Sequence, residues 1–386
     1  MRFTFATPGK VVFGRNAADQ LPTLAAARGR AALVVTGANP GRHEGLLAAL
    51  GRAGLTATVF PVAGEPDVAT AEAGARLARE AGCDLVIGLG GGGALDTAKA
   101  AAALATNIED VYAYLEVVGE GRPLTARPLP VLAVPTTAGT GAEATANAVL
   151  TVPGKRVKVS LRSPMMLPEV ALVDPLLSAS MPPAVTAATG LDALTQLLEA
   201  FVSNMANPMT DALCREGLGR AARALPAAYA HGADLDARED MALASLLGGL
   251  ALANAKLGAV HGFAAPLGGL FAAPHGQVCA SLLPHVAEAN IRALRQRAPE
   301  SPSLAAYAEA AAILTGKSEA RPEDGAVWLA ATCRRLDAPS LSRLGPTPAD
   351  IPAIVAQASR ASSMKGNPVA LTDEELAAVL KAALAA

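Results

Sequence analysis

Charge of either sign is scarce in this chain of 386 residues, and neither sign predominates. Charged side chains make up 17% of the residues, and the formal net charge is -2. A protein that binds nucleic acid usually has a basic surface, and an acidic tail would give a clear negative excess. The composition indicates neither, so we expect no nucleic-acid partner.

Cysteine is also scarce. The four cysteines, Cys83, Cys214, Cys279 and Cys333, lie far apart in the sequence and form no Cys-x-x-Cys pair. The pattern therefore predicts neither a disulfide framework nor a zinc site built from cysteines alone. Unpaired thiols are typical of a reducing compartment, so the expected location is the cytoplasm.

Long apolar runs are missing as well. A membrane-spanning helix needs about 18 or more apolar residues, and no run of that length is free of polar or helix-breaking residues. The first residues contain Arg2 and Lys10 without the apolar core of a signal sequence. We therefore expect neither membrane insertion nor export.

The first half of the chain alternates short β-rich runs with helical stretches, which is typical of a parallel sheet with crossover helices. Ligand-binding loops are expected to follow the strands. The expected strands are residues 31–36, 56–62, 84–89, 130–135 and 170–174, and the clearest helices are residues 69–81 and 96–105.

Beyond the segment Met181-Pro182-Pro183 the β-branched runs disappear. The remainder consists of stretches rich in Ala and Leu with helical spacing, interrupted by Gly and Pro. We therefore expect two domains, an α/β domain over residues 1–181 and an all-helical domain over residues 182–386.

Four successive glycines, Gly90, Gly91, Gly92 and Gly93, follow the third expected strand and open a helix. Bare backbone N–H groups and the helix dipole favour a phosphate there, so the turn is a candidate cradle for a dinucleotide. Gly88, Gly90 and Gly93 fit the G-x-G-x-x-G pattern, but not after the first strand and without the usual downstream acidic residue. The alternative is a tight turn that requires positive φ.

A second loop, PTTAGTG at residues 135–141, follows the next strand and places three hydroxyl groups beside two glycines. The hydroxyls belong to Thr136, Thr137 and Thr140, and such groups suit phosphate and ribose. The alternative is a capped loop that leads into a helix with Glu143 in its first turn.

Three of the five histidines fall between residues 260 and 286, and two of them, His261 and His275, lie in apolar surroundings. Asp192 and Gln196 are four residues apart on an expected helix, so they share one face. A carboxylate and two imidazoles can hold a divalent cation, with an amide oxygen as a weak fourth ligand. The alternative is that these histidines are hydrogen-bonded core residues.

Several segments resemble the iron-containing alcohol dehydrogenases. Residues 90–99 (GGGGALDTAK) are similar to the family's G-G-G-S-x-x-D-x-A-K, residues 135–145 (PTTAGTGAEAT) to its P-T-T-x-G-T-G-S-E-x-T, and residues 186–199 (TAATGLDALTQLLE) to its A-A-T-G-x-D-A-L-T-H-x-x-E. Residues 261–268 and 274–286 resemble the stretch with its later histidines. The resemblance implies a Rossmann-like nucleotide-binding domain followed by an all-helical metal-binding domain, the dehydroquinate synthase-like fold.

By position, the resemblance implies that the glycine turn (residues 90–93) and the threonine loop (residues 135–141) bind a nicotinamide cofactor. It also implies that Asp96 and Lys158 contact this cofactor, Lys158 near its nicotinamide end. It assigns metal roles to Asp192, Gln196, His261 and His275. Gln196 replaces a histidine ligand, Gly93 and Ala142 replace serines, and Ala265 replaces a histidine often assigned to proton relay. His285 is interpreted as a structural residue at a helix end.

Two residues bear on which nicotinamide cofactor is used. Many family members place an aspartate after the strand at residues 31–36, where it would bond a ribose hydroxyl and repel a 2′-phosphate. This chain has Gly37 there and Arg42 five residues later, so NADP is favoured over NAD. The alternative for Arg42 is a solvated surface arginine.

The resemblance implies hydride transfer between NAD(P)(H) and a small alcohol or aldehyde, carried out by a homodimer with a divalent cation. The amide of Gln196 is a weaker metal ligand than an imidazole, so the sequence does not decide whether the cation is Fe²⁺ or Zn²⁺. Three alternatives are a polyol dehydrogenase similar to glycerol dehydrogenase, a lyase of the dehydroquinate synthase type, and a non-catalytic nucleotide-binding relative. The lyase needs basic residues that are few in the helical half, whereas Gln196 and Ala265 would be compatible with the non-catalytic relative.

Overall fold

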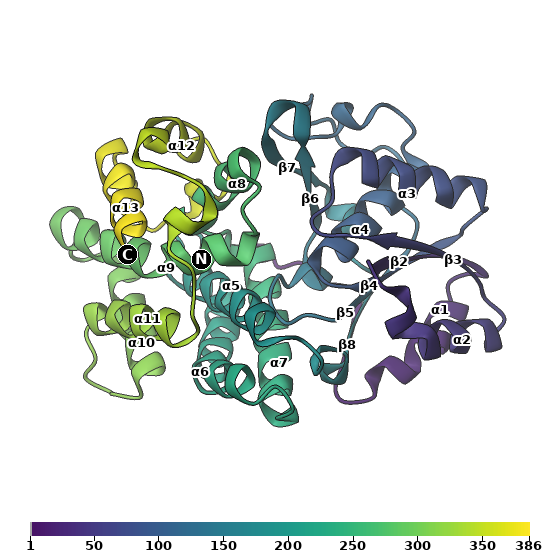
Figure 1. Ribbon diagram of the computed structural model, residues 1–386, viewed down its shortest axis with the longest axis horizontal. Coiled ribbons are helices and arrows are strands. Elements are labelled where there is room, and N and C mark those ends of the chain that lie inside the picture. The colour runs from purple at the N-terminus through teal and green to yellow at the C-terminus, as the bar shows by residue number, and fades with distance from the viewer. Residues whose placement is uncertain (1) are drawn as a thin grey trace. The chain divides into compact units, whose positions relative to one another are not determined.

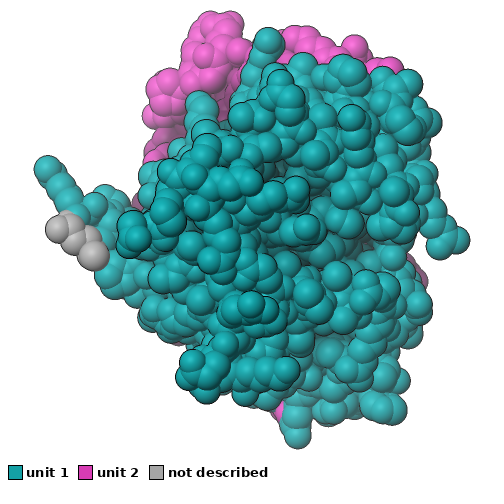
Figure 2. All heavy atoms as spheres, turned by 90° about the vertical axis from the view of Figure 1, so that its left-hand side faces the viewer, with its two compact units in different colours: residues 1–6, 180–386 teal, residues 7–179 magenta. Residues whose placement is uncertain are grey.

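The computed structural model describes residues 2–386, which divide into two compact units (Figures 1 and 2). One unit is Thr7–Ala179, and the other is Ser180–Ala386 together with the first residues up to Ala6. The backbone of Ala6 donates to and accepts from the side chain of Asn254, at 2.6 and 2.8 Å, which ties the start of the chain to the helical unit. No sequence pattern indicated this attachment, and the expected boundary at 181/182 lies two residues beyond the division.

The α/β unit contains a six-stranded parallel sheet in the order β1-β8-β5-β4-β2-β3. All five expected strands are present, within two residues at either end. Strand β1 was not expected, because its residues are exposed or half-buried and do not form the buried apolar run that marks β2, β4, β5 and β8. The strands are β1 (Lys10–Phe13), β2 (Ala31–Gly37), β3 (Thr56–Val62), β4 (Leu85–Gly90), β5 (Val131–Pro135) and β8 (Val170–Val173).

Four helices cover the two faces of this sheet (Figure 1). Alternate residues of each strand point to opposite faces, so Val34 packs with α1 and α2 while Val35 packs with α3 and α4. Both faces are therefore buried, which is why the strands read as continuous apolar runs. The helices are α1 (Leu21–Ala26), α2 (Glu44–Arg52), α3 (Val68–Glu80) and α4 (Gly92–Thr106).

The direction of strand addition reverses between β2 and β4. The chain passes from β2 outward to β3, returns to β4 on the other side of β2, and continues to β5. Ligands of open parallel sheets bind at the carboxyl ends of the strands at such a reversal. Gly37 ends β2 and Gly90 ends β4, so both lie at this point.

An antiparallel hairpin, β6 (Asn147–Val152) with β7 (Val157–Arg162), was not expected. Its buried residues alternate with less buried ones along each strand, for example Ala148, Leu150 and Val152. This period of two is the ordinary pattern of a half-buried strand. The pattern was present in the sequence, but the expected strands were those of a parallel sheet joined by crossover helices, and the two strands of this hairpin are not of that kind.

The second unit is all-helical, as expected. Helix α5 lies at its centre, packs against α6, α7, α9 and α10, and has mostly buried residues. The helices are α5 (Pro183–Val202), α6 (Pro208–Ala230), α7 (Leu235–Ala255), α8 (Ala259–Phe271), α9 (His275–Arg297), α10 (Pro302–Thr315), α11 (Pro322–Arg335), α12 (Ile351–Ala358) and α13 (Asp373–Ala385).

Within residues 2–386, no single helix is long and apolar enough to cross a membrane. Helices α7 and α8 reach the required length and composition only as a pair, and that pair is bent by 98°.

Candidate functional site

Helix α5 presents three polar side chains on one buried face. Asp192, Gln196 and Glu199 are separated by four and three residues, so they lie one above the other along the helix. Their exposed fractions are 1%, 2% and 5%. Buried charge is costly unless it is paired or binds a cation, so this face of α5 is a candidate site.

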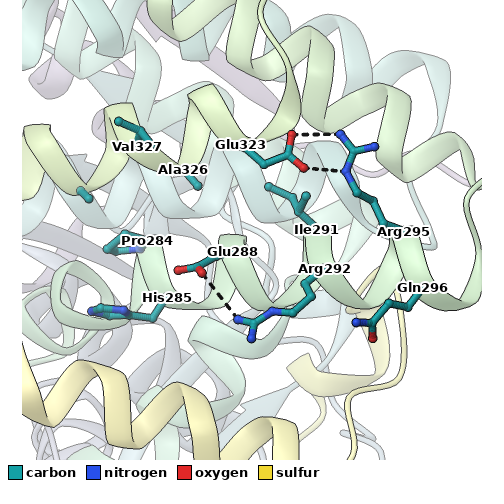
Figure 3. Close-up of a pocket in the computed structure, with 11 residues that line it drawn as sticks. Pro284, His285, Glu288, Ile291, Arg292, Arg295, Gln296, Glu323, Ala326 and Val327 are labelled. Carbon is teal, nitrogen blue, oxygen red and sulfur yellow. Dashed lines mark hydrogen bonds and ion pairs between the residues drawn. The ribbon is translucent and has the colours of Figure 1, made fainter.

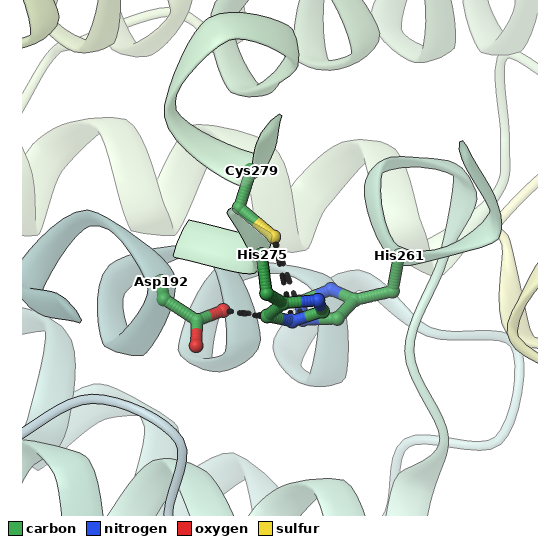
Figure 4. A group of neighbouring side chains, drawn as sticks. All are labelled: Asp192, His261, His275 and Cys279. Carbon is green, nitrogen blue, oxygen red and sulfur yellow. Dashed lines mark hydrogen bonds and ion pairs between the residues drawn. The ribbon is translucent and has the colours of Figure 1, made fainter. Parts of the chain in front are cut away.

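Two histidines from other helices meet Asp192. His261 comes from the first turn of α8, and His275 is the first residue of α9. The Oδ1 atom of Asp192 lies 3.3 Å from Nε2 of His261 and 3.6 Å from Nε2 of His275 (Figure 4). The structure thus brings together the carboxylate and the two imidazoles that the sequence suggested, although they are up to 83 residues apart.

A cysteine that the sequence analysis did not include joins this group. Cys279 lies one turn after His275 on α9, and its Sγ is 3.7 Å from Nε2 of His275 and 3.9 Å from Nε2 of His261. One donor atom from each of Asp192, His261, His275 and Cys279 lies within 4.8 Å of all the others. The spacing of four residues from His275 was the available signal, but a search for Cys-x-x-Cys pairs does not find it.

The chemistry of this donor set fits a divalent cation. Asp192 Oδ1 is buried and accepts no hydrogen bond, although two ring nitrogens point toward it. Around a tetrahedral ion, ligand atoms at about 2.0–2.3 Å lie roughly 3.3–3.8 Å from one another. The measured separations of 3.3, 3.6, 3.7 and 3.9 Å are close to that range.

The electrostatics of the group favour positive charge. Burial by itself lowers the pKa of an imidazole, but at His275 the nearby Cys279 and Asp192 outweigh it and raise the pKa to about 10. The pKa of His261 is raised for similar reasons. Burial opposes ionisation of Asp192, yet the two histidines lower the pKa of its carboxyl below the ordinary value. A divalent cation would meet the same demand for positive charge as these protons.

Glu199 fixes the orientation of His261. Its Oε2 lies 2.6 Å from Nδ1 of His261, and its Oε1 accepts a 2.7 Å hydrogen bond from the backbone N–H of Val260. A proton on Nδ1 leaves Nε2 with its lone pair toward Asp192 and Cys279. Sequence reasoning gave Glu199 no role, although its place on the face of Asp192 and Gln196 was visible.

The start of α8 is held by a further buried network. Asn367 Oδ1 accepts a hydrogen bond from the backbone N–H of Ala259 at 3.0 Å. The side-chain amides of Asn367 and Asn290 are also hydrogen-bonded to each other. A Cβ at Gly258 would lie 2.9 Å from both Asn367 Oδ1 and Glu199 Oε1. Only glycine lets these two side chains approach the backbone that precedes His261.

In the α/β unit, the glycine turn and the threonine loop lie side by side. The backbone N–H of Thr136 donates to Gly90 O at 2.9 Å. A Cβ at Gly91 would contact Thr137 Cγ2 at 3.3 Å, and a Cβ at Gly92 would lie 2.7 Å from Thr140 Cγ2. The two candidate nucleotide loops therefore form one continuous surface at the carboxyl ends of β4 and β5, beside the start of α4.

Gly37 and Arg42 lie at the neighbouring edge of the sheet. A Cβ at Gly90 would be 3.1 Å from the backbone nitrogen of Gly37, so these two glycines face each other across the reversal point. Arg42 is exposed, in the 3₁₀ helix Pro40–His43 that follows β2. A Cβ at Gly37 would have no heavy atom within 4 Å, so the space beside it is open.

Two other residues assigned to the cofactor have partners inside the α/β unit. Asp96 Oδ1 lies 2.9 Å from Lys99 Nζ, and its Oδ2 accepts from the N–H of Val149 at 2.9 Å. Lys158, on β7, forms an ion pair with Glu65. Asp96 thus joins α4 to the hairpin, and Lys158 joins the hairpin to the loop that follows β3.

Two family models together cover nearly the whole chain. Residues 8–175 match the model described as iron-containing alcohol dehydrogenase, and residues 186–384 match the model described as the C-terminal part of the Fe-containing alcohol dehydrogenase family. The chain belongs to the iron-containing alcohol dehydrogenase family. It is therefore an oxidoreductase that acts on alcohols, and the family implies a nicotinamide cofactor and a divalent metal.

Relatives of known name agree with this assignment. The chain is 36% identical to 1,3-propanediol dehydrogenase of Klebsiella pneumoniae, over 99% of this chain and 98% of that protein. It is 38% identical to alcohol dehydrogenase 4 of Saccharomyces cerevisiae, over 82% and 80%. A solved structure of a 1,3-propanediol oxidoreductase superposes with a TM-score of 0.90 at 35% identity, over 99% of this chain and all of that one. The expected fold class is confirmed.

This iron-containing alcohol dehydrogenase departs from the family pattern at Gly93, and the structure supplies a reason. A Cβ at Gly93 would lie 2.3 Å from the carbonyl oxygen of Gly64, in the loop between β3 and α3. A serine would require this loop to move. At the other replaced serine, the buried Ala142 accepts a hydrogen bond from Lys99 Nζ through its carbonyl oxygen, which needs no side-chain hydroxyl.

The remaining departures lie in the helical unit. Gln196 Oε1 would be 3.4 Å from a Cβ at Gly248, so its amide packs against α7. Ala265 lies in α8, one turn after His261. The expectation that His285 ends a helix is wrong, because α9 continues from His275 to Arg297 and places His285 in its middle.

A groove of about 620 Å³ between α9 and α11 is separate from the metal group (Figure 3). Its charged side chains pair with each other: Arg295 Nε lies 2.5 Å from Glu323, and Arg292 lies 3.6 Å from Glu288. The groove therefore offers apolar surface, mutually neutralised charges and one imidazole, that of His285.

Proposed function

We propose that this alcohol dehydrogenase interconverts a short, uncharged aldehyde and its primary alcohol with NADP(H). The observation that carries the proposal is the convergence of Asp192 Oδ1 with Nε2 of His261 and of His275. Relatives named for 1,3-propanediol support a short substrate. The apolar residues that follow His261, such as Phe263 and Ala264, support an uncharged one.

In this proposal Asp192, His261 and His275 hold a divalent cation. When bound, the cation supplies a Lewis acid that stabilises negative charge on the substrate oxygen, and the nicotinamide gives or accepts the hydride. Glu199 keeps the His261 ring in the tautomer that presents Nε2. Since Ala265 carries no ionisable group, the proton is exchanged with water rather than with a side chain at that position.

The glycine turn and the threonine loop hold the dinucleotide. The first N–H groups of α4 have no partner within the helix, and they begin at the glycines beside Thr137 and Thr140. Gly37 leaves room for a 2′-phosphate, and Arg42 supplies a charge that favours it. These two residues support NADP over NAD.

The setting of the enzyme is also a proposal. We infer a cytoplasmic homodimer with no nucleic-acid or membrane partner. The four free thiols support the cytoplasm, the net charge of -2 supports the absence of a nucleic-acid partner, and the family supports the homodimer.

Steady-state kinetics with purified, metal-loaded protein tests the function. Short aldehydes with NADPH should give the highest kcat/KM, and vicinal diols such as glycerol should be poorer substrates in the reverse direction. Asp192→Asn should abolish turnover and metal retention together, because it removes the only carboxylate among the four donors. Full activity of Asp192→Asn, or of the protein after complete removal of metal, would contradict the proposal.

A further inference from the structure

We propose that the thiolate of Cys279 is the fourth protein ligand of the metal centre, in place of the imidazole that Gln196 has replaced. The inference rests on the proposed metal site and names a ligand outside the set that the family resemblance implies. On binding, the S–H bond breaks, its proton leaves to solvent, and a sulfur–metal bond forms.

The position of Cys279 supports this assignment. It lies four residues after His275 on α9, so the two side chains share one face of the helix. Cys279 is buried, and its Sγ is 3.7 and 3.9 Å from the two Nε2 atoms (Figure 4). Sulfur and nitrogen bound to one tetrahedral ion are separated by roughly 3.5 Å, close to these values.

An independent observation concerns the buried carboxylate of this group. Asp192 is buried with 1% of its surface exposed, and its Oδ1 accepts no hydrogen bond although it is directed at the same two nitrogens. The thiol and the carboxylate both face the same two ring nitrogens, at distances of 3.3 to 3.9 Å. One cation placed among them would satisfy all four.

The other buried cysteines show what a purely structural thiol does in this fold. Cys333, on α11, donates to the carbonyl oxygen of Ala280 at 3.4 Å, and burial raises its pKa to about 12. Neither Cys333 nor Cys214 belongs to the cluster of metal-ligating side chains found within residues 2–386. Cys279 differs from both because two ring nitrogens lie 3.7 and 3.9 Å from its sulfur.

A thiolate ligand from Cys279 would change the charge of the metal site and the metal that it prefers. Gln196 contributes at most a neutral oxygen, whereas a thiolate adds a negative charge and a soft donor. Asp192 and Cys279 together would neutralise a divalent cation. The set Asp-His-His-Cys favours Zn²⁺ over Fe²⁺ more strongly than a set with only oxygen and nitrogen donors.

Cobalt substitution tests this ligand directly. The purified protein is stripped with a chelator and titrated with Co²⁺, and the absorbance is followed in the near-ultraviolet, where thiolate-to-cobalt charge transfer absorbs, and in the visible. The variants are Cys279→Ser, the matched control Cys333→Ser, and the double variant Gln196→His with Cys279→Ser. Near-ultraviolet circular dichroism of the metal-free proteins checks their folding.

We expect the wild-type protein and Cys333→Ser to show the charge-transfer band. Cys279→Ser should lose the band and bind Co²⁺ at least ten-fold more weakly. The double variant should regain affinity without the band, because an imidazole replaces the lost ligand. A wild-type cobalt protein without the band, or unchanged affinity and spectrum in Cys279→Ser, would overturn the inference while leaving the metal-dependent function intact. Failure of the wild-type protein to bind Co²⁺ or Zn²⁺ at all would overturn both.

Discussion

Glu199 Oε2 lies 2.6 Å from Nδ1 of His261, and both side chains are buried. The same carboxylate accepts a hydrogen bond from the backbone N–H of Val260, so one side chain fixes both the His261 ring and the first turn of α8. The contacts of His261 with Asp192 and Cys279 are made through Nε2. The relationship therefore determines which nitrogen is presented to a cation.

Replacement of Glu199 by alanine should weaken metal binding. Loss of the partner of a ligating histidine typically costs 10- to 100-fold in metal affinity, and we expect an effect of about that size. Competition with a chromophoric chelator measures the affinity. Glu288→Ala, in the groove between α9 and α11, is the control and should leave the affinity unchanged. Equal affinities of Glu199→Ala and wild type would show that His261 does not need this partner.

Replacement of Gly276 by alanine should displace the start of α9. A Cβ at Gly276 would lie 2.5 Å from the carbonyl oxygen of Ala188 on α5, so the helix must shift away next to His275. Overpacking of this kind costs about 1–3 kcal/mol of stability. Differential scanning calorimetry and metal titration should both detect the change. Gly219→Ala on α6 has only ordinary contacts, 3.5 Å or longer, and should be neutral or slightly stabilising.

Replacement of Gly37 by aspartate should shift cofactor preference toward NAD. The open space beside Gly37 accepts the side chain, and a carboxylate at the end of β2 would repel a 2′-phosphate. We expect the ratio of kcat/KM for NADPH to that for NADH to fall by about ten-fold or more, which is roughly 1.4 kcal/mol. Gly45→Asp, at an equally open position in α2, adds the same charge and should leave the ratio near the wild-type value.

The stability of the α/β unit should depend on pH through Glu143. Burial raises the pKa of its carboxyl from about 4.5 to about 7, even though Lys99 acts in the opposite direction. Below pH about 4.5 the group is protonated in both the folded and the unfolded chain. Between pH about 4.5 and 7 only the unfolded chain releases the proton, so stability falls as the pH rises and levels off above about 7.

Glu143→Gln should remove that part of the pH dependence, which amounts to roughly 3 kcal/mol at most. Calorimetric melting temperatures from pH 4 to pH 8 would measure it. The exposed Glu72→Gln on α3 is the control and should follow the wild-type curve. A Glu143→Gln curve parallel to that of the wild type would contradict the raised pKa.

Much of the α/β unit could be predicted because its information is local. A strand buried on both faces must be a continuous apolar run, and the runs at β2 and β4 are unmistakable. Strand β1 was missed because its residues are exposed or half-buried, and the hairpin β6–β7 because its strands alternate instead of forming continuous apolar runs. The helical spacing of Asp192 and Gln196 was equally local, which is why the sequence placed these two residues on one face.

Periodicity and motif spacing, which reside in neighbouring residues, predicted the two-part fold, most of its strands and helices, and the residue types able to bind a cation and a nucleotide. They did not reveal that Cys279 faces the two imidazoles, that Glu199 holds His261, or that His285 lies in the middle of a helix. These relationships depend on how α5, α8 and α9 pack. Packing is set by contacts between residues more than 60 positions apart, which no local pattern encodes.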